Sequence, residues 1–328
     1  MIDIKMHLNP KLTSPEVELE PIRAGFGRGL LEAGHRDVNV VALCADLTES
    51  TKMDAFAKSY PERFVEIGIA EQNLVTVAAG MSLAGKVPFI SSYAAFSPGR
   101  NWEQIRTTVC LNEANVKVVG SHAGVSVGPD GATHQMLEDI ALMRVLPNMV
   151  VVVPCDSIEA EKATLSLASY NGGAYLRLAR DKSAVVSTDK TPFALNKANI
   201  LRSGSDVTIV ACGTMVYEAL MAAEKLADSG IEAEVINAAV IKPLDTLTII
   251  ASARKTGAVM TVEEAQMAGG LGGAVAETLA DNAPTPMTRV GLEDRFGESG
   301  TTAQLFDKFG LSSPHLVKRA KQLIKRKQ

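Results

Sequence analysis

Hydrophobic and polar positions follow a repeating order along most of the chain. Short apolar runs of strand length alternate with longer segments whose apolar residues recur at helical spacing. Strands that are apolar on both faces, separated by amphipathic helices, are typical of a parallel sheet covered by helices on both sides. The pattern therefore predicts an α/β fold with two doubly wound domains.

The order of these segments predicts where the domains begin and end. The first part predicts strands at 38–44, 64–67, 87–92, 116–121, 149–153 and 174–178, and the second part predicts strands at 206–212, 234–237, 258–262 and 287–290. The helices between them are predicted at 53–59, 70–83, 101–111, 135–145, 157–169, 215–228 and 244–253, with one before 33, one ending near 280 and others in the tail. Charged and small residues around Pro192 interrupt the pattern. We predict a lead-in over 1–15, a first domain over 16–185, a linker over 186–200 and a smaller second domain over 201–328.

Composition excludes several classes of function. The chain has 328 residues, is 46% hydrophobic and carries a net charge of −4, so its overall charge does not favour binding to nucleic acid or to an anionic membrane. No apolar run has the length of a membrane span, and the N-terminus lacks the apolar core of a signal peptide. The four cysteines form no CxxC pair, which indicates a reducing compartment and favours the cytoplasm. The five histidines are too dispersed to predict a metal site.

Ligands of parallel sheets bind beyond the carboxyl ends of the strands, so polar residues at those ends are the candidates. Glu71 follows the strand 64–67 and the turn at Gly68, and it opens a helix. An isolated glutamate at such a place is usually a structural acid at the positive end of the helix dipole. Asp46 and Ser50 follow the strand before it.

The longest connection, 121–135, contains the most candidate chemistry. It carries His122, Asp130 and His134 among several glycines. Loops of this length in compact domains are usually functional, and imidazole and carboxylate groups bind hydroxyls and phosphates or move protons near neutral pH. The alternative is a solvent-exposed loop with incidental histidines.

Two further groups surround these loops. Tyr93, Phe96 and Trp102 lie at and after the strand 87–92, where they are suited to line a pocket for a flat ring, although Trp102 is equally suited to core packing. Arg23 and Arg180 are ordinary surface arginines if taken singly. If they converge with Ser50 and His122, they would bind a phosphate.

Glycine-rich stretches occur twice. GFGRG at 25–29 lies inside a predicted helix, which argues against a phosphate-binding loop. GGLGG at 269–273 follows a strand and opens a helix, so it is the better candidate for an anion site. The alternative for GGLGG is a tight turn or an interface.

Taken together, the motifs carry a family resemblance over nearly the whole chain. They are CADLTEST, RFVEIGIAEQNL, SSYAAFSPGRNWEQIR, SHAGVSVGPDGATHQ, LPNM and YLRLAR in the first domain, and IKPLD and VEEAQMAGGLGG in the second. The chain resembles the C-terminal half of transketolase, in the form in which that enzyme is split over two polypeptides. The resemblance implies a pyrimidine-binding domain followed by a transketolase C-terminal domain, with thiamine diphosphate as the cofactor.

The resemblance also implies which residues bind the cofactor. Glu71 matches the glutamate that hydrogen-bonds to the aminopyrimidine ring and activates it, and it is expected to be desolvated. Phe96 matches the ring that stacks on the aminopyrimidine. Tyr93, Trp102 and Asp46 are expected to complete the cofactor-binding set.

Substrate contacts are implied in the same way. His134 matches a histidine beside the transferred two-carbon unit, which makes it catalytic together with Glu71, and Asp130 matches the acid that recognises a donor hydroxyl. The residues that match the set binding the sugar phosphate are His122, Arg180, Arg23 and Ser50, with a weaker match for the last two. The implied reaction transfers a two-carbon ketol unit between a ketose phosphate and an aldose phosphate.

One expected motif is missing. The family binds the diphosphate and Mg²⁺ through a GDG segment, and the 328 residues contain none. We therefore expect an N-terminal partner subunit that holds Mg²⁺, an α2β2 heterotetramer, and no metal ligands in this chain.

Three alternatives share the architecture. The first is the second half of deoxyxylulose-phosphate synthase, against which His122 argues because that family lacks a histidine there. The second is the β subunit of a 2-oxo acid dehydrogenase, whose HSQ-type loop differs from GPDGATHQ. The third is a non-catalytic assembly subunit, which the intact Glu71, Asp130, His122 and His134 disfavour.

Overall fold

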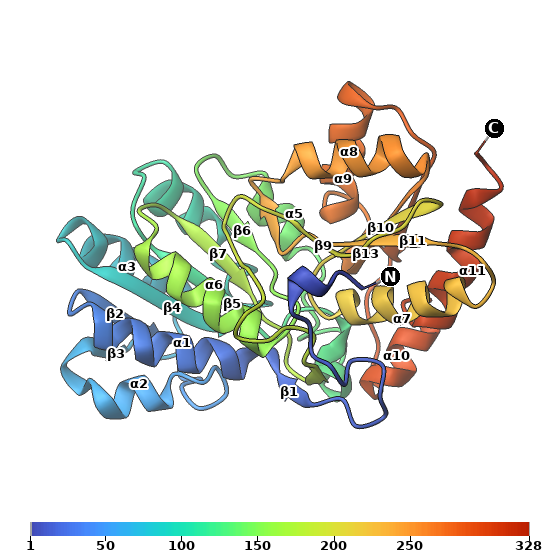
Figure 1. Ribbon diagram of the computed structural model, residues 1–328. Helices are drawn as coiled ribbons and strands as arrows, with labels where there is room; N and C mark the ends of the chain where they lie inside the picture. Colours follow the sequence, from blue (N-terminus) through green and yellow to red (C-terminus); the bar gives the residue numbers. More distant parts are fainter. Residues whose placement is uncertain (1, 328) are drawn as a thin grey trace.

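The computed structural model describes residues 2–327, which form two packed α/β domains (Figure 1). The first domain contains a seven-stranded sheet in the order β12-β6-β7-β5-β4-β2-β3. Its strands are β2 (Val40–Cys44), β3 (Phe64–Glu66), β4 (Val87–Tyr93), β5 (Lys117–Ser121), β6 (Val150–Val152), β7 (Ala174–Arg177) and β12 (Val240–Lys242). All neighbouring strands are parallel except β12, which pairs antiparallel with β6. The α/β fold predicted from the alternating pattern is confirmed.

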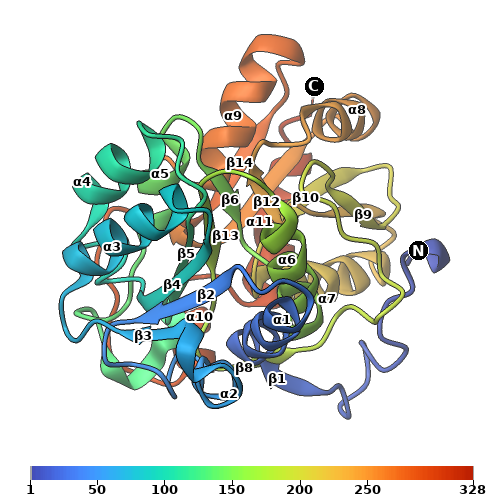
Figure 2. The ribbon, with the colours of Figure 1, turned by 90° about the vertical axis from the view of Figure 1, so that its left-hand side faces the viewer.

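Helices cover both faces of this sheet (Figure 2). One face carries α1 (Ile22–Arg36), α2 (Asp54–Ser59) and α6 (Ser157–Ser169), and the other carries α3 (Glu71–Leu83), α4 (Trp102–Gln104) with its π-helical continuation η3 (Ile105–Cys110), and α5 (Asp139–Arg144). The GFGRG stretch lies within α1 and faces α6. A Cβ atom at Gly25 would lie 1.7 Å from the Ser157 carbonyl oxygen, so these glycines permit close helix packing and do not form a phosphate loop.

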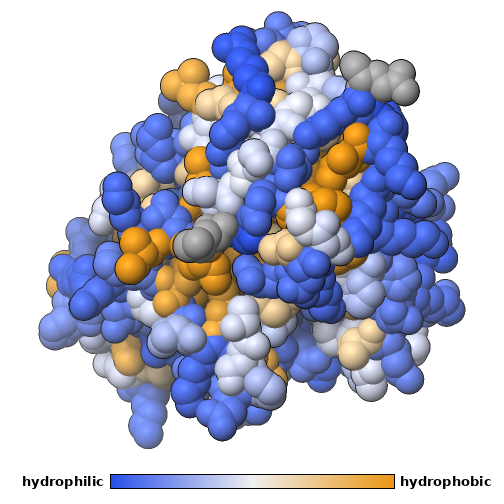
Figure 3. All heavy atoms as spheres, turned by 45° about the vertical axis from the view of Figure 1, so that its right-hand side comes forward, coloured by the Kyte–Doolittle hydropathy of each residue, from blue (hydrophilic) through white to orange (hydrophobic). Residues whose placement is uncertain are grey.

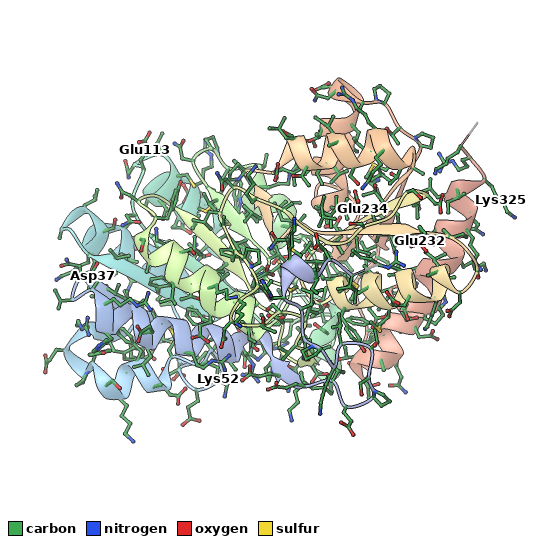
Figure 4. The ribbon with its side chains drawn as sticks, in the orientation of Figure 1. Asp37, Lys52, Glu113, Glu232, Glu234 and Lys325 are labelled. Atoms are coloured by element: carbon green, nitrogen blue, oxygen red, sulfur yellow. The ribbon has the colours of Figure 1, made fainter. Side chains whose placement is uncertain are left out.

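The second domain has a five-stranded sheet in the order β14-β13-β10-β11-β9. Its strands are β9 (Asn199–Arg202), β10 (Val207–Ala211), β11 (Ala233–Asn237), β13 (Val259–Gln266) and β14 (Met287–Leu292). The helices are α7 (Met215–Ala227), α8 (Thr246–Thr256), α9 (Leu271–Asn282), α10 (Thr302–Lys308) and α11 (Ser313–Ile324). A buried carboxylate connects α8 to this sheet. Glu234 of β11, labelled in Figure 4, accepts a hydrogen bond from Ser252 and forms an ion pair with Lys255.

The two domains share part of their structure. Strand β12 follows β11 in the chain, yet it joins the edge of the first sheet, and one hydrophobic cluster includes both Val151 of the first sheet and Ile236 of the second. The lead-in packs on the second domain, where Ile2 bridges to Arg202 and Leu12 is buried. A short antiparallel pair, β1 (Leu19–Pro21) with β8 (Lys182–Ala184), closes the first domain beside the linker.

Several short elements differ from the prediction. The pattern did not predict β1, β8, β9 or β12, which have only three or four residues each and depend on partners distant in sequence. The helix predicted at 135–145 begins only at Asp139, and the loop 121–135 contains a 3-10 segment, η4 (Val125–Asp130). Local periodicity is too weak over so few residues to reveal such pairings.

The surface and the cysteines are consistent with an ordinary globular protein. Polar side chains predominate on the face shown in Figure 3, where hydrophobic ones gather in a few patches. All four cysteines are buried and free. Within residues 2–327 no helix has the length and apolar character needed to cross a membrane.

Candidate active site

Most of the predicted site residues lie at the carboxyl ends of the parallel strands of the first sheet. Glu71 follows β3, Tyr93 ends β4, His122 follows β5 and Arg180 follows β7. Because β3, β2, β4, β5 and β7 are parallel and adjacent in that order, these ends meet at one edge of the sheet.

Glu71 is buried in the first turn of α3, with 2% of its surface exposed. Its Oε2 lies 2.7 Å from Nη1 of Arg100, and the Ser92 hydroxyl donates to Oε1 at 3.5 Å. Asn101 donates to the Glu71 backbone carbonyl at 2.9 Å. A buried carboxylate needs such partners because desolvation penalises its charge. The expected desolvation of Glu71 is present, but the sequence did not predict its ion pair with Arg100.

A second glutamate positions the turn before Glu71. Glu66 accepts hydrogen bonds from the backbone N–H groups of Asp46 at 2.7 Å and Gly68 at 2.9 Å, and from the Thr48 hydroxyl at 3.2 Å. Gly68 has a φ of +79°, which glycine adopts without strain. Glu66 thus fixes the loops after β2 and β3 relative to each other. Asp46 is exposed, and this contact involves only its backbone.

Four ring side chains form what we call the aromatic cluster: Tyr93, Phe96, His122 and His134. Tyr93 stacks on His122 with ring centroids 3.8 Å apart and on Phe96 at 6.0 Å. His134 meets Phe96 edge to face at 5.6 Å. The two loops that the sequence singled out are therefore in direct contact.

Trp102 does not join the aromatic cluster. Its indole N–H donates to the Leu142 carbonyl at 2.8 Å, and its ring packs against the core between the sheet and α5. Its predicted place in the pocket wall is therefore not what the structure shows. A buried indole needs a partner for its N–H group, and α5 supplies one. Trp102 anchors the segment that carries Phe96 and Arg100.

Arg23, Arg180 and His122 form a second group, the cationic cluster. Arg23 donates to the backbone carbonyls of Arg180 at 3.2 Å and Ser50 at 2.5 Å. Burial lowers the pKa of His122 to about 3, and the positive charges of Arg23 and Arg180 contribute to the same shift. Burial, with Arg180 beside it, also lowers the pKa of Arg23. Near neutral pH the two arginines are charged and His122 is not, and two arginines so close to each other favour a bound anion.

The histidine loop, 121–135, is fixed by residues from both domains. Glu264 of β13 accepts hydrogen bonds from the Ser126 N–H at 3.1 Å and hydroxyl at 3.2 Å. Gln135 donates to the Glu298 carbonyl at 2.9 Å, and Arg180 donates to the Val127 carbonyl at 3.1 Å. The segment 125–128 is buried, so the alternative of a solvent-exposed loop is wrong for that part. Asp130 is exposed at the end of η4.

The GGLGG stretch is closed by a carboxylate of its own domain. Glu263 accepts hydrogen bonds from the N–H groups of Leu271 and Gly272, both at 2.8 Å, at the start of α9. A Cβ atom at Gly270 would lie 2.0 Å from Glu263 Oε2. The donors that an external anion would need are therefore occupied, and the interpretation as a tight turn is the correct one. Among residues 2–327, no cluster of three or more His, Cys, Asp or Glu is arranged to hold a metal ion.

Comparison with known protein families identifies both domains. Residues 21–184 match the pyrimidine-binding domain of transketolase, and residues 196–316 match the transketolase C-terminal domain. The chain belongs to the transketolase family. Membership implies dependence on thiamine diphosphate.

Relatives show which branch of the family the chain resembles. It is 42% identical over 314 residues to the 6-deoxy-6-sulfo-D-fructose transketolase subunit SqwH of Clostridium sp. (strain MSTE9), covering 95% of this chain and 98% of that one. The solved structure of a split gene transketolase, an inactive β4 tetramer, matches with a TM-score of 0.88 and 44% identity over 94% of this chain and 99% of that chain. The 1-deoxy-D-xylulose-5-phosphate synthase of Thermomicrobium roseum is 40% identical over 298 residues, 90% of this chain but 47% of that protein. The chain is a subunit of the split-transketolase type.

Proposed function

We propose that this chain is the C-terminal, pyrimidine-binding subunit of a thiamine-diphosphate-dependent transketolase that transfers a two-carbon ketol unit from a ketose phosphate to an aldose phosphate. One observation carries the proposal. Printed contacts run from Glu71 to Arg100, Phe96, Tyr93 and His122 in turn, and the positive charges of Arg23 and Arg180 act on His122 at the end of this series. Such a series offers a buried acid and a ring face to a flat heterocycle, and it offers arginines to a phosphate.

The residues present fit the coenzyme. In the structure, Phe96 and Glu71 already contact the planar, N–H-bearing guanidinium of Arg100, at 4.7 Å from the ring centroid and 2.7 Å from Oε2. An aminopyrimidine is also planar and carries N–H groups, so it can make both contacts. When bound, the coenzyme supplies the carbon nucleophile and accepts the electron pair of the two-carbon unit. Glu71 holds the proton at the pyrimidine nitrogen, and Phe96 and Tyr93 orient the ring. We propose that Asp46, in the loop after β2, completes the coenzyme-binding set.

We propose that the cationic cluster and the histidine loop bind the substrate. Arg23, Arg180 and His122, with Ser50 beside them, bind the phosphate of the sugar. The Ser121 hydroxyl lies 2.9 Å from Nδ1 of His122. His122 is uncharged near neutral pH because burial lowers its pKa, so it can contribute hydrogen bonds without adding charge. His134 lies beside the transferred unit, and Asp130 recognises a donor hydroxyl.

The site requires a second polypeptide. The 328 residues contain no GDG segment, so we propose that an N-terminal subunit binds the diphosphate and Mg²⁺ and that two copies of each subunit assemble in the cytoplasm. Nucleic acid and membrane are not proposed as partners.

Reconstitution tests this function. The chain is purified with the GDG-bearing polypeptide that accompanies it in the native cell, then supplied with thiamine diphosphate, Mg²⁺, xylulose 5-phosphate and an aldose phosphate. We expect ketol transfer by the complex and none by either chain alone. Full activity of the isolated chain would contradict the two-chain site.

The similarity to 1-deoxy-D-xylulose-5-phosphate synthase favours one second candidate, condensation of pyruvate with an aldose phosphate. The same complex is assayed with pyruvate in place of xylulose 5-phosphate. Turnover of pyruvate without turnover of xylulose 5-phosphate would replace the proposed reaction with this one. A sulfonated ketose, included because of the Clostridium relative, tests whether the cationic cluster prefers phosphate.

A further inference from the structure

Arg100 contacts both Glu71 and Phe96, the two residues that we propose bind the aminopyrimidine. Its Nη1 lies 2.7 Å from Oε2 of Glu71, and its guanidinium lies over the Phe96 ring at 4.7 Å from the centroid. Glu71 is 2% exposed, whereas the Arg100 side chain is 49% exposed. The buried acid is therefore neutralised from the solvent side, by a long side chain that can leave.

We infer that Arg100 occupies the position of the aminopyrimidine in the coenzyme-free subunit and is displaced when the coenzyme binds. This inference rests on the proposed function. A guanidinium is a flat group with several N–H donors, and it stacks on aromatic faces. It therefore satisfies Glu71 and Phe96 with the same two interactions that an aminopyrimidine would use.

The surrounding backbone allows this exchange. The Arg100 N–H donates to the Phe96 carbonyl at 2.9 Å, and the next residue, Asn101, is anchored to the Glu71 carbonyl at 2.9 Å and the Ser97 hydroxyl at 3.1 Å. The main chain is thus fixed, while the half-exposed side chain of Arg100 extends to the buried Glu71. Rotation of one side chain is enough to open the place beside Glu71.

Two consequences follow from this geometry. Without Arg100, Glu71 would be a buried carboxylate with no cation beside it, a state that is costly in a desolvated site. Arg100 therefore stabilises the subunit before assembly. Arg100 also competes with the coenzyme, so part of the coenzyme's binding energy is used to displace it. When Arg100 leaves, the Glu71 carboxylate becomes free to form a hydrogen bond with the ring.

The single tryptophan, Trp102, provides a fluorescence signal close to this exchange. Thiamine, which has the aminopyrimidine without the diphosphate, is titrated into the full-length chain, and thiamine diphosphate with Mg²⁺ is titrated into the two-chain complex. We expect Arg100→Ala to lower the Kd in both titrations by about 3- to 10-fold, the size of one ion pair and one stacking contact. Arg100→Lys keeps the charge without the flat face and should give a smaller gain.

Controls separate competition from other effects. Arg106→Ala removes an exposed arginine near Arg100 in the sequence and should leave both Kd values unchanged. In a Glu71→Gln background, the gain from Arg100→Ala should shrink, because only the contact between Arg100 and the Phe96 ring is left to be displaced. Thermal unfolding of each variant verifies that it is folded, and Arg100→Lys carries the test if Arg100→Ala does not fold.

The outcomes are distinct. Unchanged binding in both Arg100 variants would overturn the inference, and weaker binding would overturn it by making Arg100 a coenzyme ligand. If no form of the complex binds thiamine diphosphate, wild type included, the proposed function fails and the inference fails with it. Tighter coenzyme binding by Arg100→Ala, with a smaller gain when Glu71 is replaced, supports both the inference and the proposed function.

Discussion

The carboxyl edges of the two sheets contain similar groups that are satisfied in opposite ways. Each edge has a buried glutamate at the N-terminal end of a helix: Glu71 at α3 in the first domain and Glu263 at α9 in the second. Glu263 is held by two backbone N–H groups and fills the space beside Gly270. Glu71 is held by the side chain of Arg100, which is half exposed.

The two glutamates differ in whether a ligand can replace the group that is bound to the carboxylate. Backbone amides cannot leave without unfolding the start of the helix, so Glu263 is a structural acid. A side chain at the surface can rotate away, so the place beside Glu71 can pass to a ligand. Burial and a helix N-terminus are common to both glutamates; what differs is the partner, an exposed side chain for Glu71 and backbone N–H groups for Glu263.

The largest expected effect is on catalysis at the carboxyl edge of the first sheet, where Glu71 lies. In the two-chain enzyme, Glu71→Gln should lower kcat by about 100- to 10,000-fold, the usual contribution of a positioned acid or base, because an amide cannot hold the proton at the pyrimidine nitrogen. Steady-state transfer from xylulose 5-phosphate measures it. Glu62→Gln, at an exposed glutamate shortly before β3, is the matched control and should be silent. Near-normal turnover by Glu71→Gln would remove its catalytic role.

The second effect is on the stability of the protein and comes from the carboxyl edge of the second sheet, where Glu263 lies. Glu263→Ala leaves the N–H groups of Leu271 and Gly272 without their acceptor and should lower the free energy of unfolding by about 2 to 4 kcal/mol. Urea unfolding measures it. At a temperature where the variant is folded, kcat should change by less than about 3-fold, because the lost hydrogen bonds lie within the second domain and contact no proposed site residue. A large fall in kcat with intact stability would mean that the second edge is functional after all.

The third effect is on substrate affinity at the cationic cluster. Arg180→Met should raise KM for phosphorylated substrates by about 10- to 100-fold, the equivalent of one charge-assisted pair. His122→Ala should act in the same direction more weakly, because His122 is uncharged near neutral pH. Unphosphorylated substrates are the control, and an equal loss with them would contradict a phosphate site.

The smallest effects are pH dependences of opposite sign at the two edges. Burial lowers the pKa of His122 to about 3, so between about pH 6.5 and 3 the unfolded chain binds a proton that the native chain does not, and stability falls as pH falls. Burial raises the pKa of Glu263 to about 7, so between about pH 4.5 and 7 the native chain keeps a proton that the unfolded chain releases, and stability falls as pH rises.

Urea unfolding at a series of pH values tests both signs. The difference in unfolding free energy between wild type and each variant, His122→Asn or Glu263→Gln, should change by at most about 1.4 kcal/mol per pH unit within its window. If the free-energy difference changed with pH in the same direction for both variants, the opposite pKa shifts given for His122 and Glu263 would be contradicted.

The sequence predicted the parts of this comparison that depend on local pattern. Long apolar strands and the loops after them placed Glu71, Tyr93, His122 and Arg180 at one edge, because parallel strands align their carboxyl ends. The sequence could not predict β12, since three residues cannot indicate that they join the sheet of the other domain.

The side chains that hold the candidate site residues and their loops were also beyond the sequence. Arg100, Glu264 and Gln135 contact residues that are distant along the chain or whose approach depends on the loop path. For Trp102 the sequence left a pocket wall and core packing equally open, and the resemblance favoured the pocket; in the structure its N–H donates to the Leu142 carbonyl and its ring packs on the core. A signal for Arg100 was available: it is the one arginine in the segment between Phe96 and Trp102.

The most direct measurement is a crystal structure of the chain with its N-terminal partner, thiamine diphosphate and Mg²⁺. We predict an aminopyrimidine ring stacked on Phe96 with its nitrogen on Glu71, the guanidinium of Arg100 rotated away, and the start of α9 still closed by Glu263. An aminopyrimidine bound away from Glu71, with the Glu71–Arg100 pair intact, would contradict the account.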